Sequence, residues 1–332
     1  MLQVLVKTSR VLFIVVILSS MLLSACEEDK KDESTQEKTI GVLNLSPGME
    51  SVLAGFKATM TERGYEEGKN ITYIYQGPAG SVEGLDPLIE ELKTHDLDLV
   101  LAFGTPTAQK AQAAFADTDI PVLFGPVNDP ITAGLVTSIT THSENVSGVQ
   151  NGASVAKGLE WLSKIMPEAK NVYVPHNPDD ASSIASLLSL QEIAPSLDIE
   201  LLINEVTTND ELTTALAEIP EDADAVFILR VAMFDARTAD FVPPANALGI
   251  PVMASRSDIL EATDVIIGFG PDFYKIGQQA AGLAVQILEG TKASDLPIET
   301  SEEYLSINLK AAEAIGIEMP NEILNQANEI IR

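Results

Sequence analysis

The chain has 332 residues, 20 Lys or Arg against 49 Asp or Glu, and a formal net charge of −29. An acidic surface of this kind repels nucleic acid and anionic lipid headgroups, which excludes both as partners of the folded chain. Its 45% hydrophobic content suffices for a packed interior. Because a single core rarely grows past about 250–300 residues, the length predicts two domains.

Residues 1–25 predict a signal peptide. Two basic residues precede the apolar stretch 11–25, and small residues lead to Cys26, the only cysteine of the chain. A basic start, a short apolar run and small residues before the cleavage point are typical of secretion signals. The stretch of 15 residues is too short for a membrane span, which needs about 20.

The segment 22–26, Leu-Leu-Ser-Ala-Cys, resembles the lipobox of bacterial lipoproteins. The resemblance implies that Cys26 receives a diacylglyceryl group, with acyl chains such as palmitate, and becomes the first mature residue. Residues 26–38 are charged and lack apolar periodicity, so we expect an acidic tether. The protein would be exported and lipid-anchored to the outer face of the cytoplasmic membrane, in the periplasm or at the cell surface. With its only thiol lipidated, it would form no internal disulfide.

The first half of the mature chain alternates short apolar runs with longer helical patterns. Strands are expected at 40–45, 71–75, 97–103 and 121–124. Helices are expected at 48–63, 86–94 and 106–116. Strands that alternate with helices are typical of a parallel sheet covered by helices.

The same alternation restarts in the second half. Strands are expected at 171–174, 199–204, 225–229, 251–254 and 265–269. Helices are expected at 154–165, 180–194, 209–218, 235–248 and 272–289. We therefore predict an α/β fold of two similar lobes with parallel sheets, in which the architecture is repeated but the sequence is not.

Five polar residues are each followed by proline. They are Ser46-Pro47, Asp86-Pro87, Thr105-Pro106, Asp129-Pro130 and Asn177-Pro178. A polar N-cap residue with Pro at the first helical position predicts a helix start. Four of the five follow apolar strands, at the carboxyl edge where open α/β sheets bind ligands. The residues either bind a ligand or only cap helices, and the sequence leaves both interpretations open.

Enzyme motifs are sparse. His95, His142 and His176 are far apart, and the chain lacks a metal-binding HExxH pair, a GxSxG nucleophile motif and a phosphate-binding loop. The segment 268–270, Gly-Phe-Gly, lacks the third glycine of a dinucleotide fingerprint and is predicted to be a tight turn. The sequence therefore predicts no catalytic residue, metal or cofactor, and it indicates capture of a ligand rather than its conversion.

Several short segments occur in a specific order. They include Gly-Tyr-Glu-Glu-Gly-Lys-Asn-Ile at 64–71, Phe-Gly-Thr-Pro-Thr-Ala at 103–108, Asn-Val-Ser-Gly-Val at 145–149 and Ile-Asn-Leu-Lys-Ala-Ala at 307–312. In this order, over about residues 39–331, the chain resembles the solute-binding lipoproteins of bacterial ABC importers, in the family with tryptophan- and tyrosine-binding members.

The resemblance implies a type I periplasmic binding protein. In this fold two Rossmann-like lobes are joined by three crossover strands, and the ligand binds in the cleft between them. Lobe 1 would comprise 39–149 and 272–290, and lobe 2 would comprise 150–271. Residues 291–332 would form a C-terminal crossover segment and helices. Closure around a ligand would be a hinge motion.

The pockets of this family are built from loops at strand ends, and carrying that pattern over yields ten candidate ligand-binding residues. In lobe 1 they are Asn44, Ser46, Thr105, Pro106, Thr107 and Asn128. In lobe 2 they are His176, Asn177, Ser182 and Arg230. Hydroxyl and backbone N–H groups of Thr105, Thr107 and Ser182 would donate hydrogen bonds to the ligand.

The loop after Leu229 departs from the family pattern. Amino-acid binders of the family carry there an acidic residue that could meet an α-ammonium group, whereas this chain has Val231, preceded by Arg230. Arg230 is either an outward charge or a cleft residue that pairs with a carboxylate. The expected ligand is an aromatic amino acid or another small ring-bearing or carboxylate compound.

Five aromatic residues at or near strand ends are candidates for an apolar slot. They are Phe103, Phe124, Tyr173, Phe234 and Phe269. Most are expected in the core, and one or two in the cleft would favour a ring-bearing ligand.

The resemblance implies a monomeric solute-binding component that delivers a small molecule to an ABC permease and its ATPase. Two alternatives stay open. An extracytoplasmic sensor for a membrane receptor would have the same domain. An exported enzyme on the same fold has less support, because the triad and metal motifs are missing.

Overall fold

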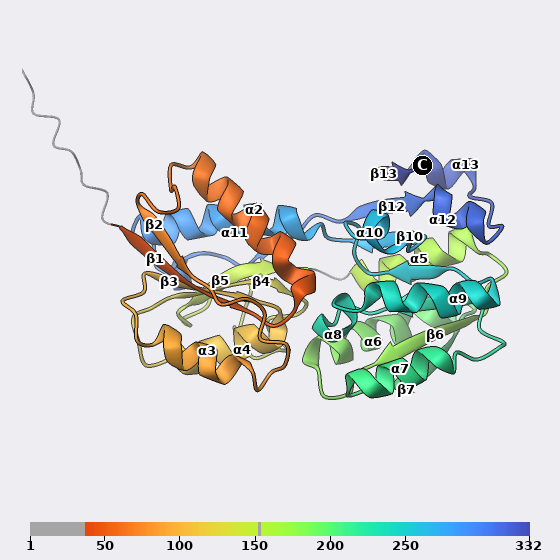
Figure 1. Ribbon diagram of the computed structural model, residues 1–332, viewed down its shortest axis with the longest axis horizontal. Coiled ribbons are helices and arrows are strands. Elements are labelled where there is room, and N and C mark those ends of the chain that lie inside the picture. The colour runs from red at the N-terminus through yellow and green to blue at the C-terminus, as the bar shows by residue number, and fades with distance from the viewer. Residues whose placement is uncertain (1–36, 152–153) are drawn as a thin grey trace, which may run out of the picture. The chain divides into compact units, whose positions relative to one another are not determined.

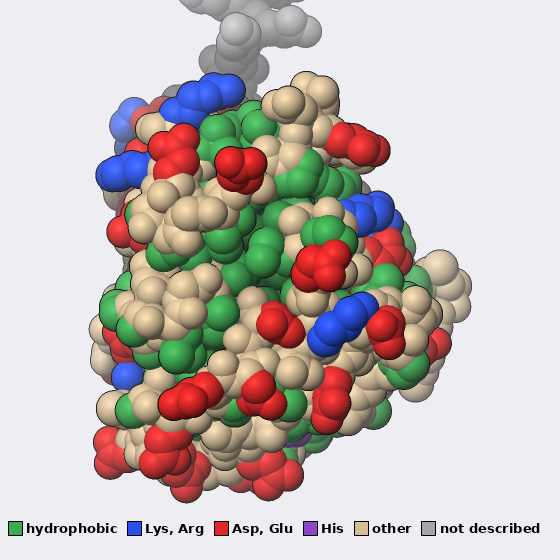
Figure 2. All heavy atoms as spheres, turned by 90° about the vertical axis from the view of Figure 1, so that its right-hand side faces the viewer, with side chains coloured by type: hydrophobic (Ala, Val, Ile, Leu, Met, Phe, Trp, Pro, Cys, Tyr) green, Lys and Arg blue, Asp and Glu red, His purple; other side chains and the backbone are tan. Residues whose placement is uncertain are grey.

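The computed structural model describes residues 37–151 and 154–332. Lys38–Arg332 form one unit, in which the strands build two sheets (Figure 1). We call the part of the chain around the first sheet lobe 1 and the part around the second lobe 2. The predicted signal peptide, Cys26 and residues 27–36 of the predicted tether lie outside the described residues. Acidic side chains are spread over the face of the molecule that Figure 2 shows.

Lobe 1 contains, within the described chain, a parallel sheet in the order β11-β5-β4-β3-β1-β2. Its strands are β1 (Lys38–Asn44), β2 (Ile71–Ile74), β3 (Leu99–Phe103), β4 (Val122–Val127), β5 (Val146–Gln150) and β11 (Glu299–Thr300). Its helical elements are η1 (Pro47–Met49), α2 (Glu50–Glu62), α3 (Leu85–Leu92), α4 (Thr105–Phe115), α11 (Phe273–Leu288) and η4 (Ala293–Asp295). Helices α2 and α11 pack on one face, and α3 and α4 on the other. Because both faces are covered, β3 and β4 are buried along their whole length.

Lobe 2 repeats this plan. Its sheet has the order β13-β12-β10-β9-β8-β6-β7, parallel except for the β10–β12 pair. The strands are β6 (Asn171–His176), β7 (Glu200–Glu205), β8 (Ala225–Ile228), β9 (Val252–Ala254), β10 (Ile267–Gly270), β12 (Tyr304–Asn308) and β13 (Glu329–Ile331). The longer helices are α5 (Ser154–Ile165), α6 (Ala181–Ile193), α7 (Asn209–Ala217) and α9 (Val242–Leu248). Shorter ones are η2 (Ala194–Leu197), α8 (Ala232–Asp235), η3 (Thr238–Phe241), α10 (Leu260–Thr263), α12 (Leu309–Ala314) and α13 (Asn321–Leu324).

The two sheets share one strand order. β2-β1-β3-β4-β5 in lobe 1 corresponds to β7-β6-β8-β9-β10 in lobe 2, which is the flavodoxin-like order of doubly wound α/β folds. The chain passes from one sheet to the other after β5, after β10 and between β11 and β12. The predicted α/β fold of two lobes with largely parallel sheets is confirmed.

Several local predictions were wrong. The helix expected at 235–248 is divided into α8, η3 and α9, because Pro243 and Pro244 lack backbone N–H donors and fit only the first turn of α9. The helix expected at 48–63 is likewise divided into η1 and α2. The segment 268–270 belongs to strand β10 and is not a tight turn. A side chain at Gly268 would collide with the Arg256 carbonyl at 2.5 Å, so glycine there permits close packing.

Two of the polar–proline pairs begin turns instead of helices. The Asp129 carboxylate accepts backbone N–H bonds from Ile131 and Thr132, but Gly134 has a φ of 73° and ends the turn. The Asn177 Oδ1 accepts from Asp179 N, and α6 begins only after Asp180, which caps it. Capping strength alone therefore does not decide where a helix begins.

Candidate functional site

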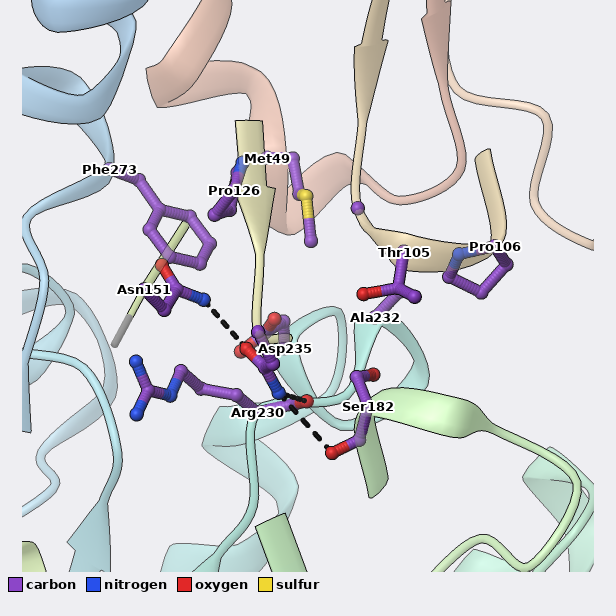
Figure 3. Close-up of a pocket in the computed structure, with 12 residues that line it drawn as sticks. Met49, Thr105, Pro106, Pro126, Asn151, Ser182, Arg230, Ala232, Asp235 and Phe273 are labelled. Carbon is purple, nitrogen blue, oxygen red and sulfur yellow. Dashed lines mark hydrogen bonds between the residues drawn. The ribbon is translucent and has the colours of Figure 1, made fainter. Parts of the chain in front are cut away.

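A pocket lies between the lobes, at the carboxyl ends of the parallel strands (Figure 3). Lobe 1 lines it with Met49, Gly104, Thr105, Pro106, Pro126 and Asn128. Lobe 2 and the segments that pass between the two sheets line it with Asn151, Ser182, Arg230, Ala232, Asp235 and Phe273. About 290 Å³ of empty space, part of it open to solvent, lies among these residues, and only about 20 Å³ of it can hold the centre of a water molecule. A solute therefore needs the lobes to move apart before it can enter.

The lobe 1 wall is built from two strand ends. Register places Asn44 of β1 opposite Phe103 of β3, so the loops that follow them emerge side by side. Ser46 Oγ accepts from Gly48 N at 3.2 Å and caps η1, which brings Met49 to the pocket. After β3, Gly104 adopts a φ of 87°, a conformation that favours glycine. That turn starts α4 directly at the pocket, with Thr105 in its first turn.

The lobe 2 wall is built in the same way. Asp180 caps α6 by accepting from the backbone N–H groups of Ser182 and Ser183 at 2.7 and 3.2 Å. Arg230 follows β8, and α8 then carries Ala232 and Asp235 into the lining. In Figure 3, Ser182, Arg230 and Asp235 lie opposite Met49 and Thr105.

Asn128 connects the two walls. Its Nδ2 lies within hydrogen-bond distance of Ser182 O (3.2 Å), Ser186 Oγ (3.1 Å) and, weakly, Arg230 O (3.4 Å). Its Oδ1 accepts from Asn151 Nδ2 at 2.7 Å. A residue at the end of a lobe 1 strand is thus bonded to helix α6 and the loop after β8 in lobe 2, and to the segment that follows β5.

Two charged residues line the pocket. Arg230 is 4% exposed, and burial lowers its pKa to about 10, with Glu303 and then Asp235 acting in the opposite direction. Its guanidinium extends toward the side of Asn151 and Phe273 in Figure 3. The Asp235 side chain is also 4% exposed. Burial raises the pKa of Asp235 to about 6, although Arg256 partly offsets that effect.

Arg256 ties lobe 2 to lobe 1 beside this pocket. Its Nε and Nη2 donate to the two carboxylate oxygens of Asp258 at 2.8 and 2.9 Å, and its Nη1 donates to the Gly48 carbonyl at 2.9 Å. The guanidinium also lies over the Phe273 ring, 3.7 Å from its centroid. Burial acts to lower the pKa of Arg256, but the carboxylates of Asp258, Asp235 and Asp272 together outweigh burial and raise it.

Five of the ten candidate residues line the pocket, and five do not. Thr105, Pro106, Asn128, Ser182 and Arg230 are brought together there. The other five lie outside the lining: Asn44, Ser46, Thr107, His176 and Asn177. Asn44, for example, donates to Glu50 and Tyr75 and accepts from Ser46 N. Its amide is therefore used in fixing the β1–η1 loop.

His176 and Asn177 both form hydrogen bonds with the Ser183 hydroxyl, behind the pocket wall. His176 Nδ1 lies 2.9 Å from Ser183 Oγ, and Asn177 N donates to the same oxygen at 2.8 Å. Burial lowers the pKa of His176, so the ring is neutral at pH 7. Thr107 is fully buried within α4, and its Oγ1 has no hydrogen-bond partner among the described residues.

Sequence reasoning missed several lining residues. Met49, Pro126, Asn151, Asp235 and Phe273 were not among the candidates, although all belong to the lining. None of the five expected aromatic residues lines the described pocket, and the ring that does is Phe273, at the start of α11. Phe103, Phe124, Tyr173 and Phe234 are fully buried. A strand-end aromatic is as suited to the core as to a cleft, so the sequence carries no signal that separates the two.

Two further features bear on function. Within residues 37–151 and 154–332, no group of three or more His, Cys, Asp or Glu side chains is arranged to hold a metal ion. In the same part of the chain, no helix is both long and apolar enough to cross a membrane.

Comparisons with known proteins agree with one another. A sequence model of the family described as ABC transporter substrate binding protein matches residues 39–331. The chain is 27% identical over 311 residues to a tyrosine-binding protein of Clostridioides difficile strain R20291, covering 90% of this chain and 89% of that protein.

Solved structures show the same fold. The ABC domain of Streptococcus pneumoniae in complex with L-Trp matches with a TM-score of 0.83 and 22% identity, covering 89% of this chain and 100% of that one. The ligand-free, open structure of a substrate-binding protein with adhesive properties from Clostridium difficile matches with a TM-score of 0.66 and 27% identity. That match covers 89% of this chain and 99% of the other.

Proposed function

Because this chain belongs to the ABC transporter substrate-binding protein family and is a solute-binding component, we propose that it captures its solute in the pocket between the lobes. The observation that carries this proposal is that both lobes line one pocket. A ligand held there touches both lobes, so it stabilises the closed arrangement over an open one by its differential contacts.

We propose a small solute with an apolar ring and a carboxylate, such as an aromatic amino acid. The side chains of Met49, Pro106, Pro126 and Phe273 supply apolar walls, and Thr105, Asn128 and Ser182 supply polar groups. Relatives point in the same direction, since one is named a tyrosine-binding protein and another was solved in complex with L-Trp. Arg230 is the proposed partner of the ligand carboxylate, because a guanidinium matches carboxylate geometry.

The remaining site residues have a supporting role in this proposal. Asn44, Ser46, His176 and Asn177 hold the loops that present Met49 and Ser182. Thr107 packs inside α4, the helix that presents Thr105. The solute is bound and released without chemical change.

Anchoring and delivery complete the proposal. The protein is a lipoprotein attached through Cys26 to the outer face of the cytoplasmic membrane, and it acts as a monomer that hands its solute to a permease and an ATPase. Export is supported by the family, whose members work outside the cytoplasm, and the anchor by the lipobox resemblance at 22–26. Mass spectrometry of the N-terminal peptide tests the lipid on Cys26, and its absence would contradict the anchor.

The binding proposal is tested with the purified mature protein and a panel of small metabolites of all charge types. Ligands that bind the native state raise the unfolding free energy by about 2.7 kcal/mol at a hundredfold excess over Kd. We therefore expect a clear rise in Tm with a few compounds, which mass spectrometry recovers unchanged. If no small molecule raises Tm, solute capture is contradicted.

Arg230 has a test of its own. We expect Arg230→Ala to weaken binding of L-tryptophan at least about tenfold, because a charge-assisted bidentate contact is lost. Binding of tryptamine, which has no carboxylate, should change much less. Equal losses for both compounds, measured by calorimetry, would show that Arg230 supports the fold of the pocket and does not bind a carboxylate.

A further inference from the structure

The side-chain amide of Asn128 lines the pocket, but its donors are directed at lobe 2. Asn128 directly follows β4, the strand that ends at Val127. Among the described residues, its Nδ2 faces Ser182 O at 3.2 Å, Ser186 Oγ at 3.1 Å and, more weakly, Arg230 O at 3.4 Å. A carbonyl oxygen accepts a hydrogen bond but cannot donate one, so the amide nitrogen has to be the atom that faces these carbonyls. An asparagine side chain has only two N–H donors, and lobe 2 therefore uses both.

Lobe 1 fixes the amide in this orientation. Asn128 Oδ1 accepts from Asn151 Nδ2 at 2.7 Å, and the backbone N–H of Asn151 donates to Val127 O at 2.8 Å. Asn151 directly follows β5, where the chain leaves the first sheet. Because these bonds lie at the lobe 1 end, they hold the donors of Asn128 in position when lobe 2 moves away. Little rotamer freedom is then lost when the lobes meet again.

The acceptor at the shortest distance lies outside the pocket. Ser186 is 2% exposed within α6 and does not belong to the described lining. Its bond to Asn128 therefore contains no atom that a solute in the pocket would touch. Since Ser186 belongs to lobe 2 and Asn128 to lobe 1, the bond exists only while α6 lies against the end of β4. It thus favours the closed arrangement by the same free energy whichever solute is bound.

We propose that Asn128 is a positioning residue that keeps the lobes closed and so slows the release of every solute by the same factor. A solute leaves only after the lobes separate, and their separation breaks the bonds from Asn128 to α6 and to the loop after β8. The guanidinium of Arg230 differs, because the effect of a bond to one group of the solute depends on that group. The role of Asn128 rests on the proposed function, since it requires a solute held between the lobes.

Release rates test the proposal. We would measure association and dissociation rates by surface plasmon resonance on the immobilised mature protein, for L-tryptophan, tryptamine and each further metabolite of the panel that raises Tm. We expect Asn128→Ala to raise the dissociation rate of each compound about tenfold, a loss of the size expected for a pair of hydrogen bonds. The factor should be the same for all compounds, and the association rates should not fall.

Ser186→Ala tests the bond without altering the lining. We expect it to raise the dissociation rate of the same compounds about threefold. The double variant should release each compound no faster than Asn128→Ala alone, because both changes break the same bond. The matched control is Ser189→Ala, the same change further along α6. The Ser189 hydroxyl donates to Ala185 O at 3.1 Å within the helix, so its loss should leave every rate unchanged.

The outcomes separate this proposal from the one on which it depends. If the factor for Asn128→Ala differs between compounds, Asn128 binds the solute directly and the proposal is wrong, while solute capture stands. The same conclusion follows if Ser186→Ala releases every compound at the wild-type rate. If no metabolite of the panel binds, solute capture itself fails, and the role of Asn128 fails with it. Ser186→Ala and its control decide the question even if Asn128→Ala does not fold.

Discussion

Two buried arginines of lobe 2 show how neighbouring loops give one residue type different roles. Arg256 donates a bidentate pair to Asp258, stacks on Phe273 and bonds the Gly48 carbonyl, and the pKa of Arg256 is raised despite burial. Burial lowers the pKa of Arg230 to about 10. Arg256 therefore ties the lobes together through bonds inside the protein, whereas Arg230 lines the pocket and is the partner that we propose for a ligand carboxylate.

The pKa of Asp235 leads to a prediction for the pH dependence of binding. Burial raises this pKa to about 6 against an ordinary value of 3.8, so the folded protein takes up a proton as the pH falls through 6. Asp235 lines the pocket, and an ionised carboxylate there would attract the ammonium group of an amino acid more than a neutral one would, so that proton would compete with such a ligand. Below pH 6 we expect the Kd for L-tryptophan to rise by up to about tenfold per pH unit.

Calorimetry at pH 7 and pH 5 checks this prediction. Four charged groups surround Asp235: Arg256 and Asp258 from the loop after β9, Arg230 from the loop after β8, and Asp180 at the start of α6. Arg230 and Arg256 stay protonated over this range, and neither Asp180 nor Asp258 lines the pocket. The Asp235→Asn protein should lack the rise, and an equal rise in that variant would assign the effect to another group.

At the scale of elements, helices α2 and α11 hold lobe 1 together although they are distant in sequence. They approach closely because both carry glycine at the contact. A Cβ on Gly55 would lie 1.9 Å from the Tyr274 carbonyl oxygen, and one on Gly277 would lie 2.0 Å from the Val52 carbonyl oxygen. The long separation in sequence is bridged because α11 returns to lobe 1 after β10.

Gly277→Ala should separate these helices. The added methyl meets backbone, which cannot move aside as a flexible side chain can, so we expect the free energy of unfolding to fall by about 1–3 kcal/mol. Denaturant unfolding measures the change. An unchanged unfolding midpoint would mean that the two helices adjust without loss.

Gly282→Ala, on the same helix, is the matched control. Nothing lies within 4 Å of its added Cβ, so alanine should stabilise the helix by about 0.5–1 kcal/mol.

At the scale of the whole molecule, function depends on how the lobes meet. Gly48 of lobe 1 lies against Asp235 of lobe 2, where an added Cβ would be 3.0 Å from the Asp235 backbone carbon. Asn128, Arg256 and the backbone N–H of Phe273 supply polar links between the lobes. The closed arrangement thus depends on a few contacts around the pocket, which suits a protein that must open to take up its solute.

Gly48→Ala should shift the balance toward an open form. The methyl is tolerated if the lobes move slightly apart, so we expect weaker binding without loss of fold. A shift of about 1 kcal/mol would lower affinity roughly fivefold. Calorimetry gives the affinity, and small-angle X-ray scattering with saturating ligand should show a larger radius of gyration than in wild type. Equal affinity and equal radius would contradict the prediction.

The sequence predicted correctly those structural features that depend on residues adjacent in the chain, such as buried strands and the order of strands and helices. Apolar runs such as Leu99–Phe103 identify buried strands, and the pattern of strands and helices predicted two α/β lobes. The resemblance to a family whose pockets are built from strand-end loops led to Thr105, Pro106, Asn128, Ser182 and Arg230, which line the pocket. The predictions for signal peptide, tether and Cys26 rest on local patterns too, and they stay predictions.

Only the tertiary structure decided which side chains meet in the pocket. The family carries its acidic residue at the position of Val231, whereas the acid that lines this pocket is Asp235, one helical turn later. Phe273 comes from a segment that crosses between the lobes. Asn44 and His176 have suitable chemistry, but their polar atoms are already hydrogen-bonded behind the wall. The physical reason is that burial and charge compensation depend on residues distant in the chain. The sequence thus determined the secondary-structure elements and their order, and the packing of the two lobes against each other determined which side chains line the pocket.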